Sequence, residues 1–336
     1  MEIRLRVSQV KSIMPLGRIL FILILLAGVT APAIPAHAQS EPPLTNAQNL
    51  IVLSDFNEVL YERNSRERIP LASLTKLMTA IVVMRNADLN GLTRIVEHDM
   101  VGEATMGLVY DDELTIGDLL YGLMIPSGND AAMALARTVG WREGDATPEQ
   151  SVDRFVQMMN ATARQIGLRD THFQNPHGLD ADHHYSTAFD VAIMLRTALN
   201  YPEIRERMTT SAIRVGNYYD LYSNNPLLRD RSDYLGGKTG LTDNAGFCLA
   251  TAARRDGRMV IAVVMRDDWN WWTDVDLLLD YGLDLAHERG IPSYASPDMV
   301  GSQLDQPRPT TQLIAQPAEE PPFIGPVMPG QSSAQR

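Results

Sequence analysis

The sequence contains a single cysteine, Cys248, among 336 residues. One cysteine cannot form an intramolecular disulfide, and its isolation excludes cysteine-rich zinc and iron–sulfur sites. Positive charge is also scarce, because 29 lysines and arginines face 41 aspartates and glutamates, for a net charge of −12. A chain this acidic has no net field that attracts phosphate backbones. We therefore expect no nucleic-acid partner.

Long apolar runs are nearly absent, and the one that exists, residues 19–29, is too short for an ordinary membrane span. Basic residues precede it, and the small-x-small pattern Ala36-His37-Ala38 follows it. This order is typical of a signal peptide over residues 1–38, with cleavage before Gln39. We expect an exported protein, periplasmic or secreted. An uncleaved N-terminal anchor is the alternative.

The C-terminal residues also lack the features of a folded domain. From residue 293 to 336 the sequence is rich in Pro, Gln, Ser and Thr, and apolar periodicity disappears. We expect a disordered tail without the amphipathic helix of a C-terminal membrane anchor. Residues 39–44 are then a short linker and residues 45–292 one folded domain. Within it, Cys248 lies in an apolar run and is expected to be a buried small hydrophobe.

Secondary-structure patterns change twice along this domain. Two β-type runs, at 50–53 and 59–61, flank the turn sequence Ser54-Asp55-Phe56-Asn57. Helical patterns follow, and strand patterns return before a last helix. The helices are expected at 73–86, 116–125, 130–139, 151–166, 187–199 and 273–288, and the later strands at 211–215, 236–238, 246–253 and 259–265. This order predicts an α+β fold, in which an antiparallel sheet from both chain ends is flanked by helices and a mainly helical lobe is inserted.

The first motif whose side chains are suited to catalysis is Ser73-Leu74-Thr75-Lys76. The i to i+3 spacing places Ser73 and Lys76 on one helix face. A serine that opens a helix lies near the positive end of the helix dipole. A desolvated lysine beside another cation can lose its proton and act as a base. Taken alone, Ser-x-x-Lys occurs by chance in many proteins, and an N-cap serine followed by a solvated lysine is the better explanation of it.

Two further motifs follow in order. Ser127-Gly128-Asn129 lies between two predicted helices, where Pro126 ends the first and Asn129 or Asp130 caps the second. Such a turn can present polar side chains to a cleft. Lys238-Thr239-Gly240 lies on a predicted strand, and a glycine there lets a ligand backbone approach the strand edge.

The three motifs together resemble those of the penicillin-binding proteins and β-lactamases. The match extends into the segments 69–80, 127–132, 175–179, 185–190 and 238–246. Over residues 45–292 the chain is similar to the low-molecular-mass penicillin-binding proteins, specifically the serine-type D-alanyl-D-alanine carboxypeptidases. The resemblance implies a β-lactamase/transpeptidase-like fold and hydrolysis of peptidoglycan stem peptides. It also implies covalent inhibition by β-lactam antibiotics and no cofactor or metal.

The resemblance further implies roles for individual residues. Ser73 would attack the peptide carbonyl, Lys76 would accept its proton, and Ser127 would relay a proton to the leaving amine. The backbone N–H groups of Ser73 and Leu241 would hold the oxyanion. The implied substrate-binding residues are Asn129, Lys238, Thr239, Gly240, Leu241 and Thr242.

Two departures from the family keep alternatives open. Members carry an arginine just before the last long helix, but residues 267–273 contain none. The forty-odd residues after the domain also leave no room for the second, β-rich domain of many members. A short relative that acts as an endopeptidase on cross-links is therefore an alternative to the carboxypeptidase. A β-lactamase is disfavoured, because no Glu-x-x-Leu-Asn segment is present in the helical part. A non-catalytic penicillin- or wall-binding protein is disfavoured by the intact Ser73, Lys76 and Ser127.

Two other clusters have less specific interpretations. Four histidines and two aspartates lie close together between residues 172 and 184, a set compatible with zinc. The segment lacks a His-Glu-x-x-His helix, so we favour an ordinary loop. Trp269, Trp271 and Trp272 are expected to form a loop at the lip of the cleft, or to pack against the last helix.

Overall fold

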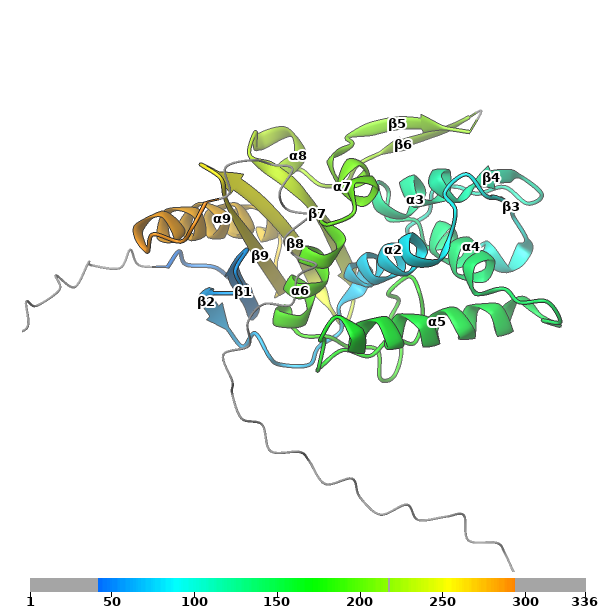
Figure 1. Cartoon of the computed structure of the whole chain (residues 1–336), viewed down its shortest axis with the longest axis horizontal. Helices are drawn as coiled ribbons and strands as arrows, with labels where there is room; N and C mark the ends of the chain where they lie inside the picture. Colours follow the sequence, from blue (N-terminus) through cyan, green and yellow to red (C-terminus); the bar gives the residue numbers. More distant parts are fainter. Residues whose placement is uncertain (1–41, 217, 294–336) are drawn as a thin grey trace, which may run out of the picture.

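The computed structural model describes residues 42–216 and 218–293 (Figure 1). The predicted signal peptide, part of the predicted linker and all but the first residue of the predicted tail lie outside the described residues. Within the described part, no helix is both long enough and apolar enough to cross a membrane.

The central sheet is built from both ends of the described chain. Its strands are β1 (Asn49–Ser54), β2 (Val59–Arg63), β7 (Tyr234–Thr242), β8 (Gly246–Arg255) and β9 (Arg258–Asp267). They lie in the order β2-β1-β9-β8-β7, and all neighbours are antiparallel. Pairing of β1 with β9, for example Leu50 with Val264, joins the two ends as predicted. The predicted turn between β1 and β2 is also present, with Asn57 in the left-handed region at φ 61°.

The predicted helices are all present, with ends that differ by a few residues. They are α2 (Thr75–Asn86), α3 (Ile116–Met124), α4 (Asn129–Gly140), α5 (Pro148–Gln165), α6 (Ala188–Ala198) and α9 (Trp271–Glu288). Helix α9 packs on one face of the sheet, whereas α6 and the helical lobe lie on the other (Figure 1). Side chains of β9 alternate between the two faces of the sheet. Val260, Ala262 and Val264 belong to the hydrophobic cluster under α9, and the residues between them belong to the larger core on the other face.

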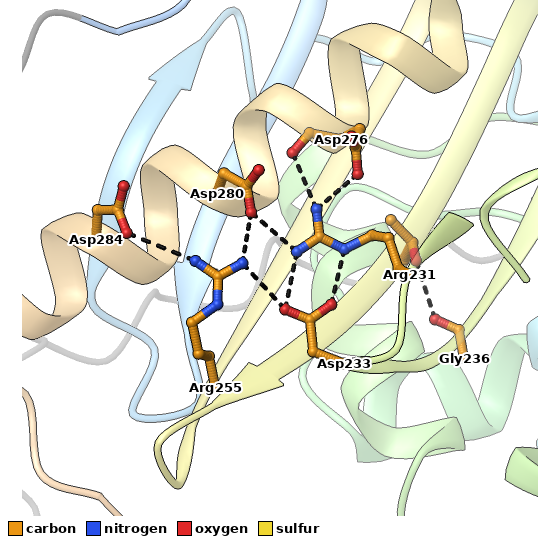
Figure 2. Close-up of polar contacts among 8 residues, drawn as sticks. Arg231, Asp233, Gly236, Arg255, Asp276, Asp280 and Asp284 are labelled. Carbon is orange, nitrogen blue, oxygen red and sulfur yellow. Dashed lines mark hydrogen bonds and ion pairs between the residues drawn. The ribbon is translucent and has the colours of Figure 1, made fainter. Parts of the chain in front are cut away.

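The close approach of α9 to the sheet depends on a glycine. A Cβ atom at Gly282 would lie 2.6 Å from Val52 Cγ1 and 2.7 Å from Val260 Cγ1. Arginines on the sheet side add polar contacts to the same helix (Figure 2). Arg231, whose side chain is buried, pairs with Asp233 beside β7 and with Asp276 and Asp280 on α9. These contacts fix the last helix against the strands that carry the third motif.

One strand assignment was wrong in its pairing. The strand predicted at 211–215 is β5 (Ala212–Val215), but it pairs with β6 (Tyr219–Tyr222) in a separate two-stranded sheet. Several elements were not predicted. Four of them have only three or four residues, which is too short for a periodic pattern: β3 (Leu92–Arg94), η2 (Glu97–Asp99), β4 (Glu113–Thr115) and α8 (Leu227–Asp230). The eight-residue helix α7 (Pro202–Thr209) was also missed.

Candidate active site

The sequence predicted that a helix begins at Ser73, but in the structure Ser73 lies two residues before the helix. It belongs to a 3-10 turn, η1 (Ala72–Leu74), and α2 begins at Thr75. Ala72 adopts a left-handed conformation, φ 49°, which turns the chain sharply ahead of the serine. The expected proximity is nevertheless present, because Lys76 Nζ lies 2.8 Å from Ser73 Oγ.

Gly240 has a structural reason in addition to the predicted approach of a ligand. A Cβ atom at this position would lie 3.1 Å from the Ser73 nitrogen and 3.1 Å from Ala72 Cβ. The protein's own serine turn, rather than a ligand alone, therefore approaches the β7 strand closely. This contact brings the first and third motifs together.

The second motif forms the turn between α3 and α4, as predicted. Ser127 is buried and adopts φ 66°. Asn129 begins α4, and its amide is engaged at both ends: Oδ1 accepts from Lys76 Nζ at 2.7 Å, and Nδ2 donates to the Gly102 carbonyl at 2.9 Å. Neither Asn129 nor Asp130 caps α4 as predicted, because the N-cap residue is Gly128 and it makes no side-chain cap.

Both lysines of the site are fully buried. Lys76 is 0% exposed and Lys238 is 1% exposed. Burial, together with the positive charge of Lys238, holds the pKa of Lys76 well below its ordinary value. Burial alone lowers the pKa of Lys238 to about 7. Lys238 Nζ donates to Ser127 Oγ at 2.8 Å and to the Thr239 carbonyl at 2.9 Å, which links the second and third motifs.

The histidine-rich segment contributes a backbone atom to the site. Lys76 Nζ donates to the His177 carbonyl at 2.6 Å. Burial, with the nearby Lys76, lowers the pKa of the His177 ring to about 3. Among the described residues, no group of three or more His, Cys, Asp or Glu side chains is arranged to hold a metal ion. The buried His184 instead contacts the Thr75 hydroxyl at 2.8 Å through Nε2.

A cleft of about 210 Å³ opens over these residues. The described residues that line it are Ser73, Ala104, Ser127, Asn224, Thr239, Gly240, Leu241, Phe247, Cys248 and Trp271. None of them has a charged side chain. A larger cavity of about 350 Å³, lined mainly by charged residues of α9 and the β8–β9 turn, contains no motif residue.

Two predicted features take an unexpected form at the cleft. Thr242 does not line it, and its hydroxyl donates to Asp180 at 2.9 Å. Trp271 and Trp272 begin α9, and Trp271 stacks on Phe247 with ring centroids 6.0 Å apart. Trp269 lies in the turn before the helix and is 74% exposed. Cys248 is buried as predicted.

Several residues of the site were not found from the sequence. They are the Gly102 and His177 carbonyls, Ala104, Asn224 and Phe247. Backbone acceptors and apolar wall residues have no characteristic side-chain chemistry. Asn224 is the exception, because its amide accepts from the Thr239 hydroxyl at 2.9 Å, but nothing in its local sequence indicates that contact.

Comparison with known proteins gives concordant matches. The family model described as D-alanyl-D-alanine carboxypeptidase matches residues 36–268. Among curated proteins, D-alanyl-D-alanine carboxypeptidase DacF of Bacillus subtilis is 34% identical over 225 residues, and DacD of Escherichia coli is 35% identical over 264 residues. The crystal structure of the Streptomyces K15 DD-transpeptidase superposes with a TM-score of 0.69 at 29% identity.

The extent of these matches differs between relatives. The K15 alignment covers 73% of this chain and 99% of that structure. The DacF and DacD alignments cover 64% and 74% of this chain, but only 56% and 65% of those proteins. The chain thus spans less than two thirds of the length of these curated relatives.

Proposed function

Because the chain belongs to the D-alanyl-D-alanine carboxypeptidase family, we propose that it is a serine hydrolase that removes the terminal D-alanine from peptidoglycan stem peptides. Ser73 is the nucleophile, Lys76 the general base and Ser127 the proton relay. The exported location expected from the N-terminal sequence agrees with a cell-wall substrate. β-Lactam antibiotics are the expected covalent inhibitors.

The observation that carries the proposal is the set of contacts around Lys76 Nζ. A neutral amine has two N–H donors and one lone pair. Two neighbours, Asn129 Oδ1 and the His177 carbonyl, only accept hydrogen bonds. The third is the Ser73 hydroxyl, which can donate its proton. The two acceptors therefore direct the lone pair of a neutral Lys76 at Ser73, as a general base requires.

The reaction then follows from this arrangement. Ser73 Oγ bonds to the carbonyl carbon of the penultimate D-alanine as its proton passes to Lys76. The C–N bond breaks as the proton held by Lys76 passes through the Ser127 hydroxyl, which is held by Lys238, to the leaving amine, so that Lys76 is neutral again. A water molecule then attacks the ester as its proton passes to Lys76, and Lys76 returns that proton to Ser73 Oγ when the ester C–O bond breaks.

The substrate contacts and the oxyanion site are also part of the proposal. The backbone N–H groups of Ser73 and Leu241 hold the developing oxyanion, a contribution worth about 3–4 kcal/mol per donor in serine hydrolases. Asn129, Thr239, Gly240 and Leu241 contact the peptide, and Lys238 and Thr239 face its terminal carboxylate. Thr242, whose hydroxyl is hydrogen-bonded to Asp180 outside the cleft lining, has no part in this contact.

A second candidate, endopeptidase activity on cross-links, is favoured by the uncharged cleft. None of the described residues that line it carries a positive side chain to meet a free carboxylate. An internal peptide bond does not require that contact. Carboxypeptidase remains the primary proposal, because Lys238 Nζ donates to Ser127 and Thr239, two residues that line the cleft.

The test is covalent labelling followed by turnover. Benzylpenicillin should add one acyl group at Ser73, detected by mass spectrometry, and Ser73→Ala should abolish it. A D-Ala-D-Ala pentapeptide should then release D-alanine. Rapid loss of the penicillin adduct would identify a β-lactamase, and a stable adduct without turnover of pentapeptide or cross-linked dimer would identify a binding protein. Labelling of Ser73→Ala at another residue would contradict the assignment.

A further inference from the structure

The loop of residues 101–112, called here the rim loop, forms one side of the cleft through Ala104. It also holds Asn129 by two hydrogen bonds. The Asn129 backbone N–H donates to the Ala104 carbonyl at 2.8 Å, and Nδ2 donates to the Gly102 carbonyl at 2.9 Å. Because a carbonyl only accepts, the contact with Gly102 fixes which end of the Asn129 amide faces Lys76.

The carboxylate of Asp130 binds the rim loop through hydrogen bonds. Asp130 is 2% exposed, and within α4 its Oδ1 accepts from the adjacent Ala131 N–H at 2.8 Å. Oδ1 accepts from the Met106 N–H at 3.0 Å, and Oδ2 accepts from the N–H groups of Gly107 and Leu108, each at 3.0 Å. The Thr105 hydroxyl also donates to Oδ2. One buried carboxylate therefore binds four consecutive residues of the rim loop.

The loop and the Ser127 turn pack too closely for any side chain between them. A Cβ atom at Gly128 would lie 2.6 Å from Asp130 Oδ1 and 3.0 Å from the Met106 nitrogen. The rim loop, the turn and Asp130 therefore form one unit, and a change at Asp130 acts on the turn that carries Ser127.

We propose that Asp130 is a positioning residue for the reaction: by holding the rim loop, it keeps the Gly102 carbonyl in place to orient the Asn129 amide, which in turn directs Lys76 at Ser73. This inference rests on the proposed role of Lys76 as general base. Asp130 itself touches neither Ser73 nor the cleft lining.

Asp130→Asn tests whether the rim loop depends on a side chain that only accepts hydrogen bonds. An ionised carboxylate only accepts, which suits the four donors from the rim loop. Asparagine has the same shape, but its NH2 group must then face either the Met106 N–H or the N–H groups of Gly107 and Leu108. A donor facing a donor cannot form a hydrogen bond, so the rim loop is released from α4.

The substitution also changes the charge around Lys76. The charged groups that act on Lys76 are Lys238, which lowers its pKa, and Asp130 and Glu103, which raise it. The His177 ring lies close as well, but its own low pKa keeps it neutral. Removal of the Asp130 charge should therefore lower the pKa of Lys76. In a plot of acylation rate against pH, the acid limb should then move to lower pH.

The experiment measures benzylpenicillin acylation of Asp130→Asn per folded molecule, with folding checked by circular dichroism. We expect the rate to fall about 10- to 100-fold, the loss associated with misplacement of catalytic groups by about 1 Å. The matched control is Asp190→Asn. Asp190 is also a buried carboxylate that accepts from a backbone N–H and a threonine hydroxyl, at Asp170 and Thr171, but it lies outside the site. Its variant should keep the wild-type rate and acid limb.

Two outcomes would overturn the inference: a wild-type rate in folded Asp130→Asn, or equal losses in both variants without a shift of the acid limb. Should Asp130→Asn not fold, Thr105→Val removes one donor and leaves the charge. It should give a smaller rate loss and an unchanged acid limb, and a wild-type rate for it would then count against the inference. Absence of acylation in the wild-type protein would instead contradict the proposed function.

Discussion

Replacement of Lys238 by methionine should stabilise the protein at neutral pH while removing its activity. The pKa of Lys238 falls from 10.5 to about 7 because the ammonium group is buried. Each unit of this shift corresponds to about 1.36 kcal/mol, so the buried lysine costs about 5 kcal/mol of stability at pH 7. Methionine removes that cost but loses the hydrogen bonds to Ser127 and Thr239, at about 1 kcal/mol each. The expected net gain is about 3 kcal/mol.

The lowered pKa of Lys238 also fixes the direction in which the free energy of unfolding changes with pH. Between pH 7 and pH 10.5 the unfolded chain binds a proton at this lysine that the folded protein does not bind. The free energy of unfolding of the wild type should therefore rise with pH in this window, by up to about 1.4 kcal/mol per unit more than that of Lys238→Met. Below pH 7 the lysine is charged in both states and the cost is constant. Above pH 10.5 the variant should be the less stable protein, because only its lost hydrogen bonds remain.

The assay is urea unfolding at pH 7, 8, 9 and 10 for both proteins, with the melting temperature as a second measure. A gain of about 3 kcal/mol corresponds to a rise of about 6–12 °C at this chain length. Arg289→Met is the control, since a partly exposed arginine stays charged throughout and its effect should not vary with pH. A variant less stable than the wild type at pH 7, or a difference that does not change between pH 7 and 10, would refute the reasoning.

Two further predictions concern the cleft and the last helix. Trp271→Arg places a cation in the cleft wall, where a charge-assisted hydrogen bond to a free carboxylate contributes about 1.5–3 kcal/mol. It should raise kcat/KM for a D-Ala-D-Ala pentapeptide about tenfold relative to the same peptide with an amidated terminus. Equal effects of the substitution on both peptides would contradict this prediction. Arg231→Met leaves Asp276 without its arginine partner, and Asp233 and Asp280 with Arg255 alone. It should lower the free energy of unfolding by about 2 kcal/mol, measured in urea, with the acylation rate per folded molecule unchanged. A loss below about 1 kcal/mol would show that the partly exposed aspartates are already well solvated.

The sequence predicted the long elements and which motif residues lie together in the site. Helices such as α5 and strands such as β9 have enough residues for a clear period, and Ser73, Lys76, Ser127 and Lys238 do come together. The pairing of β5 with β6 was not predictable, because a four-residue strand has no pattern that selects its partner.

The supporting parts of the site also escaped prediction, for a different reason. Asp130 was expected to cap its own helix, which is the usual local role of such a residue. Apart from the adjacent Ala131 N–H, its hydrogen-bond partners lie in the rim loop, more than twenty residues earlier in the chain. Likewise, the additional reason for a glycine at 240 is the serine turn, which is remote in sequence. Contacts of this kind depend on tertiary packing, and local spacing contains no information about them.

The two buried lysines of the site have a consequence for spectroscopy. Lysine occurs only three times in the sequence, at positions 11, 76 and 238, and the other residues counted as Lys plus Arg are all arginines. A protein grown with lysine labelled by ¹⁵N at Nζ would therefore give at most two amine resonances from the described part of the chain. Each could be followed through its own titration without mutation, and binding of benzylpenicillin would perturb both. The proton on each amine could thus be observed directly before and after Ser73 is acylated.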